Sequence, residues 1–226
     1  MLYLEQIKDV KNPTIINEIH YKLGLIYEFG KGVEQNYDTA QEHYETASKS
    51  GLIAAIRRLG IVFMKKGDYN NATQKLSDAY NKQDHGAVLC IVQLYELIKR
   101  KIGEKPENHE KIYALNQNIK ALLEYGQTNN MLDIILFISK SKGEPFDTIK
   151  QTFIDKIKLY KPDDIGKIKE NSKNDESAQF ILGMMYDNGL IESEDKDKAN
   201  YWYKKSYESE YSPAIFIIEE DPKQPI

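Results

Sequence analysis

A two-part motif that recurs along the chain constrains its fold more than any other feature of the sequence. The first part, Leu-Gly-x-x-aromatic, occupies residues 23–27, 59–63 and 182–186. The second part, an alanine followed by a bulky residue four positions later and a small residue three positions after that, occupies residues 40–47, 72–79 and 199–206. A weaker first part, Ile91-Val92-x-x-Tyr95, keeps the same phase. Recurrence at this spacing is typical of stacked supersecondary units that bury their apolar faces against their neighbours.

Each unit is predicted to be a pair of helices. Small residues such as Gly24 and Ala40 recur where two helices must approach closely, and an aromatic residue follows each motif glycine by three positions. Helix ends are predicted at Gly30, Gly32, Gly51, Gly67 and Gly189, and N-caps at Asn36, Asp68 and Asp84. No strand pattern competes over these stretches.

The motif resembles that of the Sel-one-like repeats, which are relatives of the tetratricopeptide repeats. The match is best over residues 19–55; residues 55–87 have a turn shorter by four residues and are more similar to a tetratricopeptide repeat. Residues 178–214 match with Ile191 in place of the second turn glycine. The resemblance implies an all-α fold, a right-handed α-solenoid of antiparallel helix pairs with about ten to twelve helices.

The whole chain, residues 1–226, is predicted to be one solenoid domain. Its parts are an N-terminal cap (1–12), repeats (13–104), a divergent helical segment (105–176), a C-terminal repeat (177–211), and a cap and tail (212–226). The divergent segment lacks the motif but keeps a helical period, with Pro106 and Pro162 at helix starts and Gly126 and Gly143 at helix stops. Residues 131–138 are apolar almost all round and are predicted to be a buried helix, with a short strand as the alternative.

Composition and charge exclude several functional classes. The longest apolar run, residues 134–138, is far shorter than the roughly 20 residues of a membrane-spanning helix, and the first residues show no leader pattern, so we predict no membrane insertion. A single cysteine, Cys90, cannot form an internal disulfide, which favours a reducing, cytoplasmic location. With 31 basic and 35 acidic side chains the net charge is −4, which does not favour nucleic-acid binding.

Residues that resemble catalytic or metal-binding motifs are better explained by roles in packing and turns. His109-Glu110 lacks the second histidine of a helical zinc motif, because residue 113 is tyrosine. Gly30-Lys31-Gly32 has no strand before it, which favours a turn over a phosphate-binding loop. Cys90 lies among apolar residues, where a buried core thiol is favoured over a nucleophile. The four histidines, residues 20, 43, 85 and 109, fall on four different predicted helices. We therefore predict no catalytic residue, no metal site and no cofactor.

The repeat phase predicts a binding face instead. In similar helical repeats the first helix of each pair lines a concave groove, on the side turned away from the Leu-Gly-x-x-aromatic contacts. Here this face is predicted to comprise Tyr21, Leu25, Glu28, Arg57, Ile61, Gln93, Glu96, Phe180, Met184 and Asp187. Its mixture of aromatic, aliphatic and oppositely charged residues favours a protein or peptide partner over a nucleic acid. The resemblance likewise implies a non-enzymatic adaptor or scaffold.

The acidic C-terminal region suggests an alternative function. Residues 177–226 carry ten acidic and five basic side chains, and Glu192, Glu194 and Asp195 crowd the turn of the last repeat. These three acids form either a solvated loop or a docking patch for a basic partner. The alternative is therefore a dedicated inhibitor or immunity-type protein that neutralises a bacterial toxin or effector by stoichiometric binding. An enzyme is the third alternative, and the sequence sets no oligomeric state.

Overall fold

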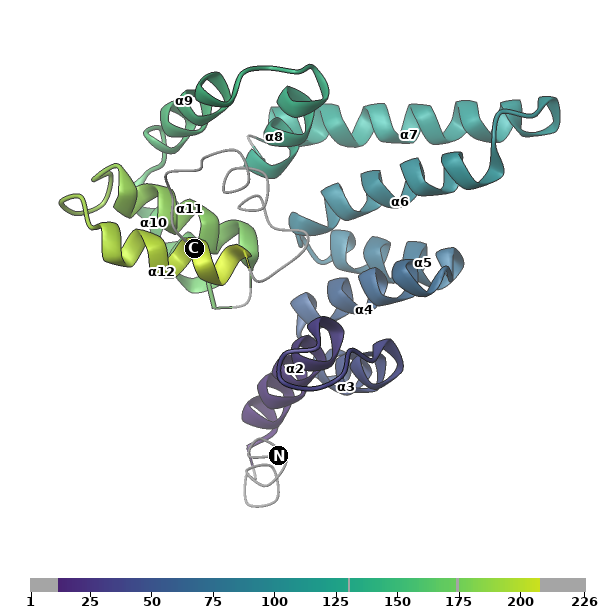
Figure 1. The fold of residues 1–226 in the computed structure, drawn as a ribbon, viewed down its shortest axis with the longest axis horizontal. Helices are drawn as coiled ribbons and strands as arrows, with labels where there is room; N and C mark the ends of the chain where they lie inside the picture. Colours follow the sequence, from purple (N-terminus) through teal and green to yellow (C-terminus); the bar gives the residue numbers. More distant parts are fainter. Residues whose placement is uncertain (1–11, 130, 174, 208–226) are drawn as a thin grey trace. The chain divides into compact units, whose positions relative to one another are not determined.

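The computed structural model describes residues 12–129, 131–173 and 175–207 (Figure 1). Within these ranges the chain forms eleven α-helices and one short 3-10 helix, and it contains no strand. The predicted all-α fold is therefore confirmed. The segments predicted as terminal caps, residues 1–12 and 212–226, lie outside the described ranges except for Asn12.

The chain falls into two compact units, residues 1–119 and 120–226, each of which is described by itself. The first unit contains α2 (Pro13–Phe29), α3 (Tyr37–Lys49), α4 (Ile53–Lys66), α5 (Tyr69–Asn81), α6 (Gly86–Ile102) and the 3-10 helix η1 (Pro106–Asn108). Helix α7 (His109–Thr128) begins in the first unit and ends in the second. The second unit continues with α8 (Leu132–Ser141), α9 (Phe146–Ile157), α10 (Pro162–Asn171), α11 (Glu176–Asp187) and α12 (Lys196–Tyr207).

In the first unit the helices α2 to α6 pack against one another in chain order. Contacts join α2 to α3, α3 to α4, α4 to α5 and α5 to α6, and α4 also touches α6. The pairs α2–α3 and α4–α5 are thus stacked through α3 and α4. Consecutive stacking of helix pairs is the arrangement of an α-solenoid, in which each pair completes the core of its neighbour.

Side-chain caps begin the second helix of both pairs. Asn36 Oδ1 accepts hydrogen bonds from the backbone N–H groups of Asp38 and Thr39, each at 3.0 Å. Asp68 Oδ1 accepts from the backbone N–H of Asn71 at 3.2 Å. Two of the three predicted N-caps, Asn36 and Asp68, are therefore confirmed, and each satisfies backbone donors that a helix start leaves without a partner.

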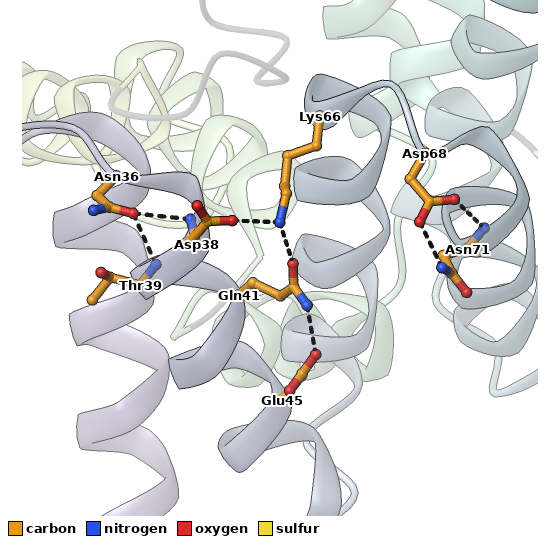
Figure 2. A network of polar contacts seen from close by, with 8 residues as sticks. All are labelled: Asn36, Asp38, Thr39, Gln41, Glu45, Lys66, Asp68 and Asn71. Atoms are coloured by element: carbon orange, nitrogen blue, oxygen red, sulfur yellow. Dashed lines mark hydrogen bonds and ion pairs between the residues drawn. The ribbon is translucent and has the colours of Figure 1, made fainter.

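A polar network ties the end of α4 to the start of α3 (Figure 2). Lys66 Nζ donates to Asp38 Oδ1 at 2.5 Å and to Gln41 Oε1 at 2.7 Å, and Gln41 Nε2 donates to Glu45 at 2.8 Å. The Asp38 side chain is 80% exposed, so water screens its attraction to Lys66. The network therefore orients the two helix ends more than it stabilises them.

A glycine facing a bulky side chain allows the helices of each pair to approach closely. The three contacts are Gly24 with Tyr44, Gly60 with Leu76, and Gly183 with Tyr203. A Cβ atom would lie 2.7 Å from Leu76 Cγ if added at Gly60, and 2.6 Å from Tyr203 Cδ1 if added at Gly183. These separations are shorter than any normal carbon–carbon contact. The structure thus confirms the helix-pair register that the repeated motif predicts.

The second unit is built around α11. This helix contacts α12, α10 and α9, and α8 contacts α9. The core of the unit includes Phe153, Phe180, Leu182, Met185 and Tyr203. The segment 105–176 is helical as predicted, and residues 132–138 belong to α8 rather than to a strand.

Gly126 does not end a helix, contrary to its predicted role as a stop. It lies inside α7, where an added Cβ would be 2.6 Å from Ile134 Cγ2 of α8. Its small size therefore serves close packing. Gly143, by contrast, follows the end of α8 with a φ of +69°, the left-handed conformation that a glycine stop adopts.

Two substitutions in the second unit test the glycine contact. Gly183→Ala is expected to lower the free energy of unfolding by about 1–3 kcal/mol, because the added methyl group overlaps the Tyr203 ring. Gly166→Ala is the matched control: this α10 position has open space around an added Cβ, and alanine should raise the free energy of unfolding by roughly 0.5–1 kcal/mol. Urea denaturation followed by circular dichroism measures both; equal effects would contradict the proposed packing.

Candidate functional site

A buried carboxylate lies next to the glycine contact of the first repeat. Glu28 of α2 is fully buried; its Oε2 accepts a hydrogen bond from Tyr44 Oη at 2.6 Å, and its Oε1 lies 3.4 Å from Arg58 Nη1. Burial and the adjacent carboxylate raise the pKa of Tyr44 well above its ordinary value, so the phenol stays protonated and donates. Glu28, predicted to face the groove, instead closes the interior of its helix pair.

The last repeat has the same arrangement. Asp187 of α11 is buried, and its Oδ2 lies within hydrogen-bond distance of Tyr203 Oη at 3.4 Å. Lys196 Nζ donates to Asp187 Oδ1 at 2.7 Å, and this contact raises the pKa of the lysine. Asp187 is therefore also an interior residue rather than part of an open groove face.

The sequence contains a signal for this acid–tyrosine pair that the motif alone did not reveal. Each acid follows its motif glycine by four positions and precedes its tyrosine by 16, in both Glu28–Tyr44 and Asp187–Tyr203. The middle repeat has Met64 at the position of the acid and Leu76 at that of the tyrosine, and both are buried. Acid occurs with tyrosine and methionine with leucine, so the two positions change together within this one chain.

Arg57 also differs from its predicted role. It is 2% exposed, and its Nε donates to Asp84 Oδ2 at 2.9 Å. Asp84 is not the N-cap of α6, because that helix begins at Gly86 after His85, without a side-chain capping bond. The Arg57–Asp84 ion pair instead fastens the α5–α6 connection to α4.

Most of the predicted groove face is buried. Besides Glu28, Arg57 and Asp187, the buried members are Tyr21, Ile61, Phe180 and Met184. Tyr21 packs at 5.9 Å from the Tyr44 ring, and Phe180 meets Phe153 edge-on at 5.9 Å. These side chains belong to the cores of their units, which corrects their assignment to an open surface.

Three members of the predicted face keep partly accessible side chains. Leu25 lies on α2, and Gln93 and Glu96 lie on α6. Glu96 pairs with Lys99 at 3.1 Å one turn along the helix. Their role in partner binding stays a prediction.

The three acids of the last turn are paired with lysines. Glu194 lies 2.8 Å from Lys196 Nζ, and Lys198 Nζ lies 2.9 Å from Glu192 and 3.3 Å from Asp195. A backbone hydrogen bond from Lys198 lowers the pKa of Asp195. The positive charges of Lys196 and Lys198 therefore offset the negative charge of this predicted docking patch.

Two of the four histidines meet between α2 and α3. His20 Nδ1 and His43 Nδ1 are 3.0 Å apart, and the ring of His43 stacks on Tyr27 with centroids 5.7 Å apart. Burial lowers the pKa of His20 below 6.5; burial and the neighbouring His20 lower that of His43, against an opposing effect of Glu42. Sequence reasoning placed these residues on different helices of the first predicted pair but missed that their rings meet.

Other expectations concern chemistry and membranes. Cys90 is buried in α6, as predicted for a core thiol. In the parts of the chain that the structure describes, no group of three or more His, Cys, Asp and Glu side chains is placed to hold a metal ion. None of the described helices combines the length and apolar character needed to cross a bilayer.

The two acid–tyrosine pairs give a matched prediction. Tyr44→Phe should lower the free energy of unfolding by about 1.5–3 kcal/mol, because the buried Glu28 loses a short hydrogen bond to its charged group. Tyr203→Phe should cost about 0.5–1 kcal/mol, because its bond is long and Asp187 keeps Lys196. Urea denaturation of both variants measures the difference, and a larger loss for Tyr203→Phe would refute the proposed ranking.

The histidine pair predicts a dependence of stability on pH. Because folding lowers both pKa values, the unfolded chain binds more protons near pH 6.5 than the folded chain does. The stability is thus fully present above that pH and falls as the pH drops below it. Denaturation is measured at several pH values with a chelator present. The free energy of unfolding should change less steeply with pH in His43→Gln than in the parent chain, and His109→Gln is the control. An unchanged slope in His43→Gln would contradict the assignment.

A comparison with known protein families finds a match for the two repeats that carry the acid–tyrosine pair. Residues 19–52 and 176–211 match the family model of the Sel1 repeat. These segments contain α2 with α3 and α11 with α12, the helix pairs described above. No curated protein matches the chain.

Two solved structures illustrate its similarities. One is c5321, a protective antigen of uropathogenic Escherichia coli strains with an SLR fold, at 17% identity and a TM-score of 0.36 over 84% of this chain and 38% of that one. The other is a Sel1 repeat protein from Oxalobacter formigenes, at 23% identity and a TM-score of 0.35 over 88% of this chain and 74% of that one. The chain thus spans little more than a third of the length of the first. The family match and the helix pairs that carry it therefore identify two Sel1-like repeats in this chain, residues 19–52 and 176–211.

Proposed function

We propose that this chain is a non-enzymatic adaptor that binds a protein or peptide partner through the first helices of its repeats. Sel1-like repeats generally act as protein-interaction modules. The observation that carries the proposal is that the matched repeats share their interior contacts, glycine with tyrosine and acid with tyrosine. Their exposed positions differ, as at Glu42 and Tyr201, which occupy the same place in the two repeats. A framework of constant interior and variable surface suits recognition of a specific partner.

The proposed contact surface lies on the first unit. It comprises the partly accessible members of the predicted face, Leu25, Gln93 and Glu96, which combine an aliphatic, an amide and an acidic side chain; the amide oxygen of Gln93 is itself buried. Such a mixture can bury an apolar anchor and orient it with polar contacts. We expect Leu25 to contribute apolar contact area and Glu96 to contribute specificity by charge.

The inhibitor alternative has less support. It depended on an acidic docking patch at Glu192, Glu194 and Asp195, and each of these carboxylates lies within 3.3 Å of a lysine amine. A basic toxin or effector would have to compete with those lysines. Partner binding that weakens steeply with salt and with Glu192→Gln would favour this alternative over the adaptor.

Site-specific photocrosslinking tests the proposed surface. A photoreactive phenylalanine derivative at position 25 or 96, in cells of the source organism, should yield an adduct with the same partner from both positions. Lys49 and Gln74, exposed on the second helices α3 and α5, are the matched control positions and should not yield that adduct. Mass spectrometry identifies the partner. Adducts from all four positions alike, or from the control positions alone, would refute the assignment.

A further inference from the structure

The contact between His20 and His43 has a chemical requirement. Their Nδ1 atoms are 3.0 Å apart. A neutral imidazole carries hydrogen on one ring nitrogen and a lone pair on the other. One Nδ1 must therefore donate to the other, or both rings carry hydrogen on Nε2 and present two Nδ1 lone pairs to the same region. The second arrangement is favourable only when a cation lies between the nitrogens.

The spacing suits a particular class of ion. Imidazole nitrogen binds first-row transition metals at about 2.0–2.1 Å. Two nitrogens 3.0 Å apart then subtend about 90° at the ion. The ring centroids are 5.2 Å apart, so each Nδ1 points mainly toward the other nitrogen, and both rings must turn slightly to direct their lone pairs at the ion. Neighbouring ligands make this angle in the square-planar or tetragonal coordination of Cu(II) and Ni(II), whereas the tetrahedral geometry of zinc requires a wider separation.

The surrounding structure holds both rings in place. His20 and His43 lie on the two helices of one pair, and His43 precedes Tyr44, whose ring fills the space at Gly24. The ring of His43 stacks on Tyr27 with an interplanar angle of 23°. Ligands on packed helices are held more firmly than ligands on loops, so little ordering is needed when an ion binds. Both rings are half-buried, which leaves access for an ion and its water molecules.

We propose that His20 and His43 form a two-histidine chelating site for Cu(II) or Ni(II), with water in the remaining coordination positions. Imidazole is a preferred ligand of these ions. The lowered pKa of both rings keeps them neutral at pH 7, as metal ligands must be. The carboxylate of Glu42, which interacts electrostatically with His43, favours a cation at this place. The site is independent of the proposed adaptor function.

Calorimetric titration of the tag-free, chelator-treated full chain with nickel chloride tests this site. We expect one ion to bind with an affinity that falls by the order of tenfold or more in His20→Gln and in His43→Gln, since each variant loses one of two ligands. His109→Gln, which alters an exposed histidine on α7, is the matched control and should bind as the parent chain does. Unchanged binding in both pair variants, or an equal loss in the control, would overturn the proposal.

A second measurement avoids mutation and any loss of folding that it causes. Cu(II) added at less than one equivalent should broaden the ring resonances of His20 and His43 before those of His85 and His109, because the paramagnetic ion relaxes nearby nuclei fastest. Broadening of all four histidines together, or of neither His20 nor His43, would overturn the proposal.

Discussion

Paired helices of this protein lie close together because a glycine on one helix leaves room for a large side chain of the other. Tyr44, Leu76 and Tyr203 each occupy the space that a Cβ would take. Other contacts within the first helix pair depend on that approach. Only at this separation can the Tyr44 hydroxyl reach Glu28, and only then do His20 and His43 come into contact.

The sequence predicted the parts of the fold that are repeated and local. Gly24 and Ala40 mark the first helix pair because small residues are needed where helices approach, and Asn36 and Asp68 begin helices because their side chains cap backbone donors. The motif-free segment 105–176 was recognised as helical from its period. Gly126 was misassigned because a glycine near a helix end suits both a stop and a close contact, and only tertiary structure distinguishes the two.

The predicted binding face was less accurate for a physical reason. Helical phase shows which side of a first helix meets its own partner, but not which other sides the neighbouring helices cover. Helix α4 touches α3, α5 and α6, and α11 touches α9, α10 and α12. Residues such as Arg57 and Phe180 therefore lie inside, held by contacts to residues 27 positions away in each case, Asp84 and Phe153. No local pattern reports such contacts.

The change of interior chemistry between repeats has a consequence for folding. In a chain of similar helices a helix could pack against the wrong partner, since the first helices α2, α4 and α11 all carry a motif glycine. Pairing α2 with α5 would place the carboxylate of Glu28 against Leu76, without the phenol that it bonds in the native pair. If α3 took the place of α5 against the motif glycine of α4, the Tyr44 hydroxyl would face Met64. Burying an unsatisfied polar group is costly. Because acid–tyrosine contacts in the first and last repeats alternate with a methionine–leucine pair in the middle repeat, each helix packs more favourably against its own partner than against the similar helix of another repeat.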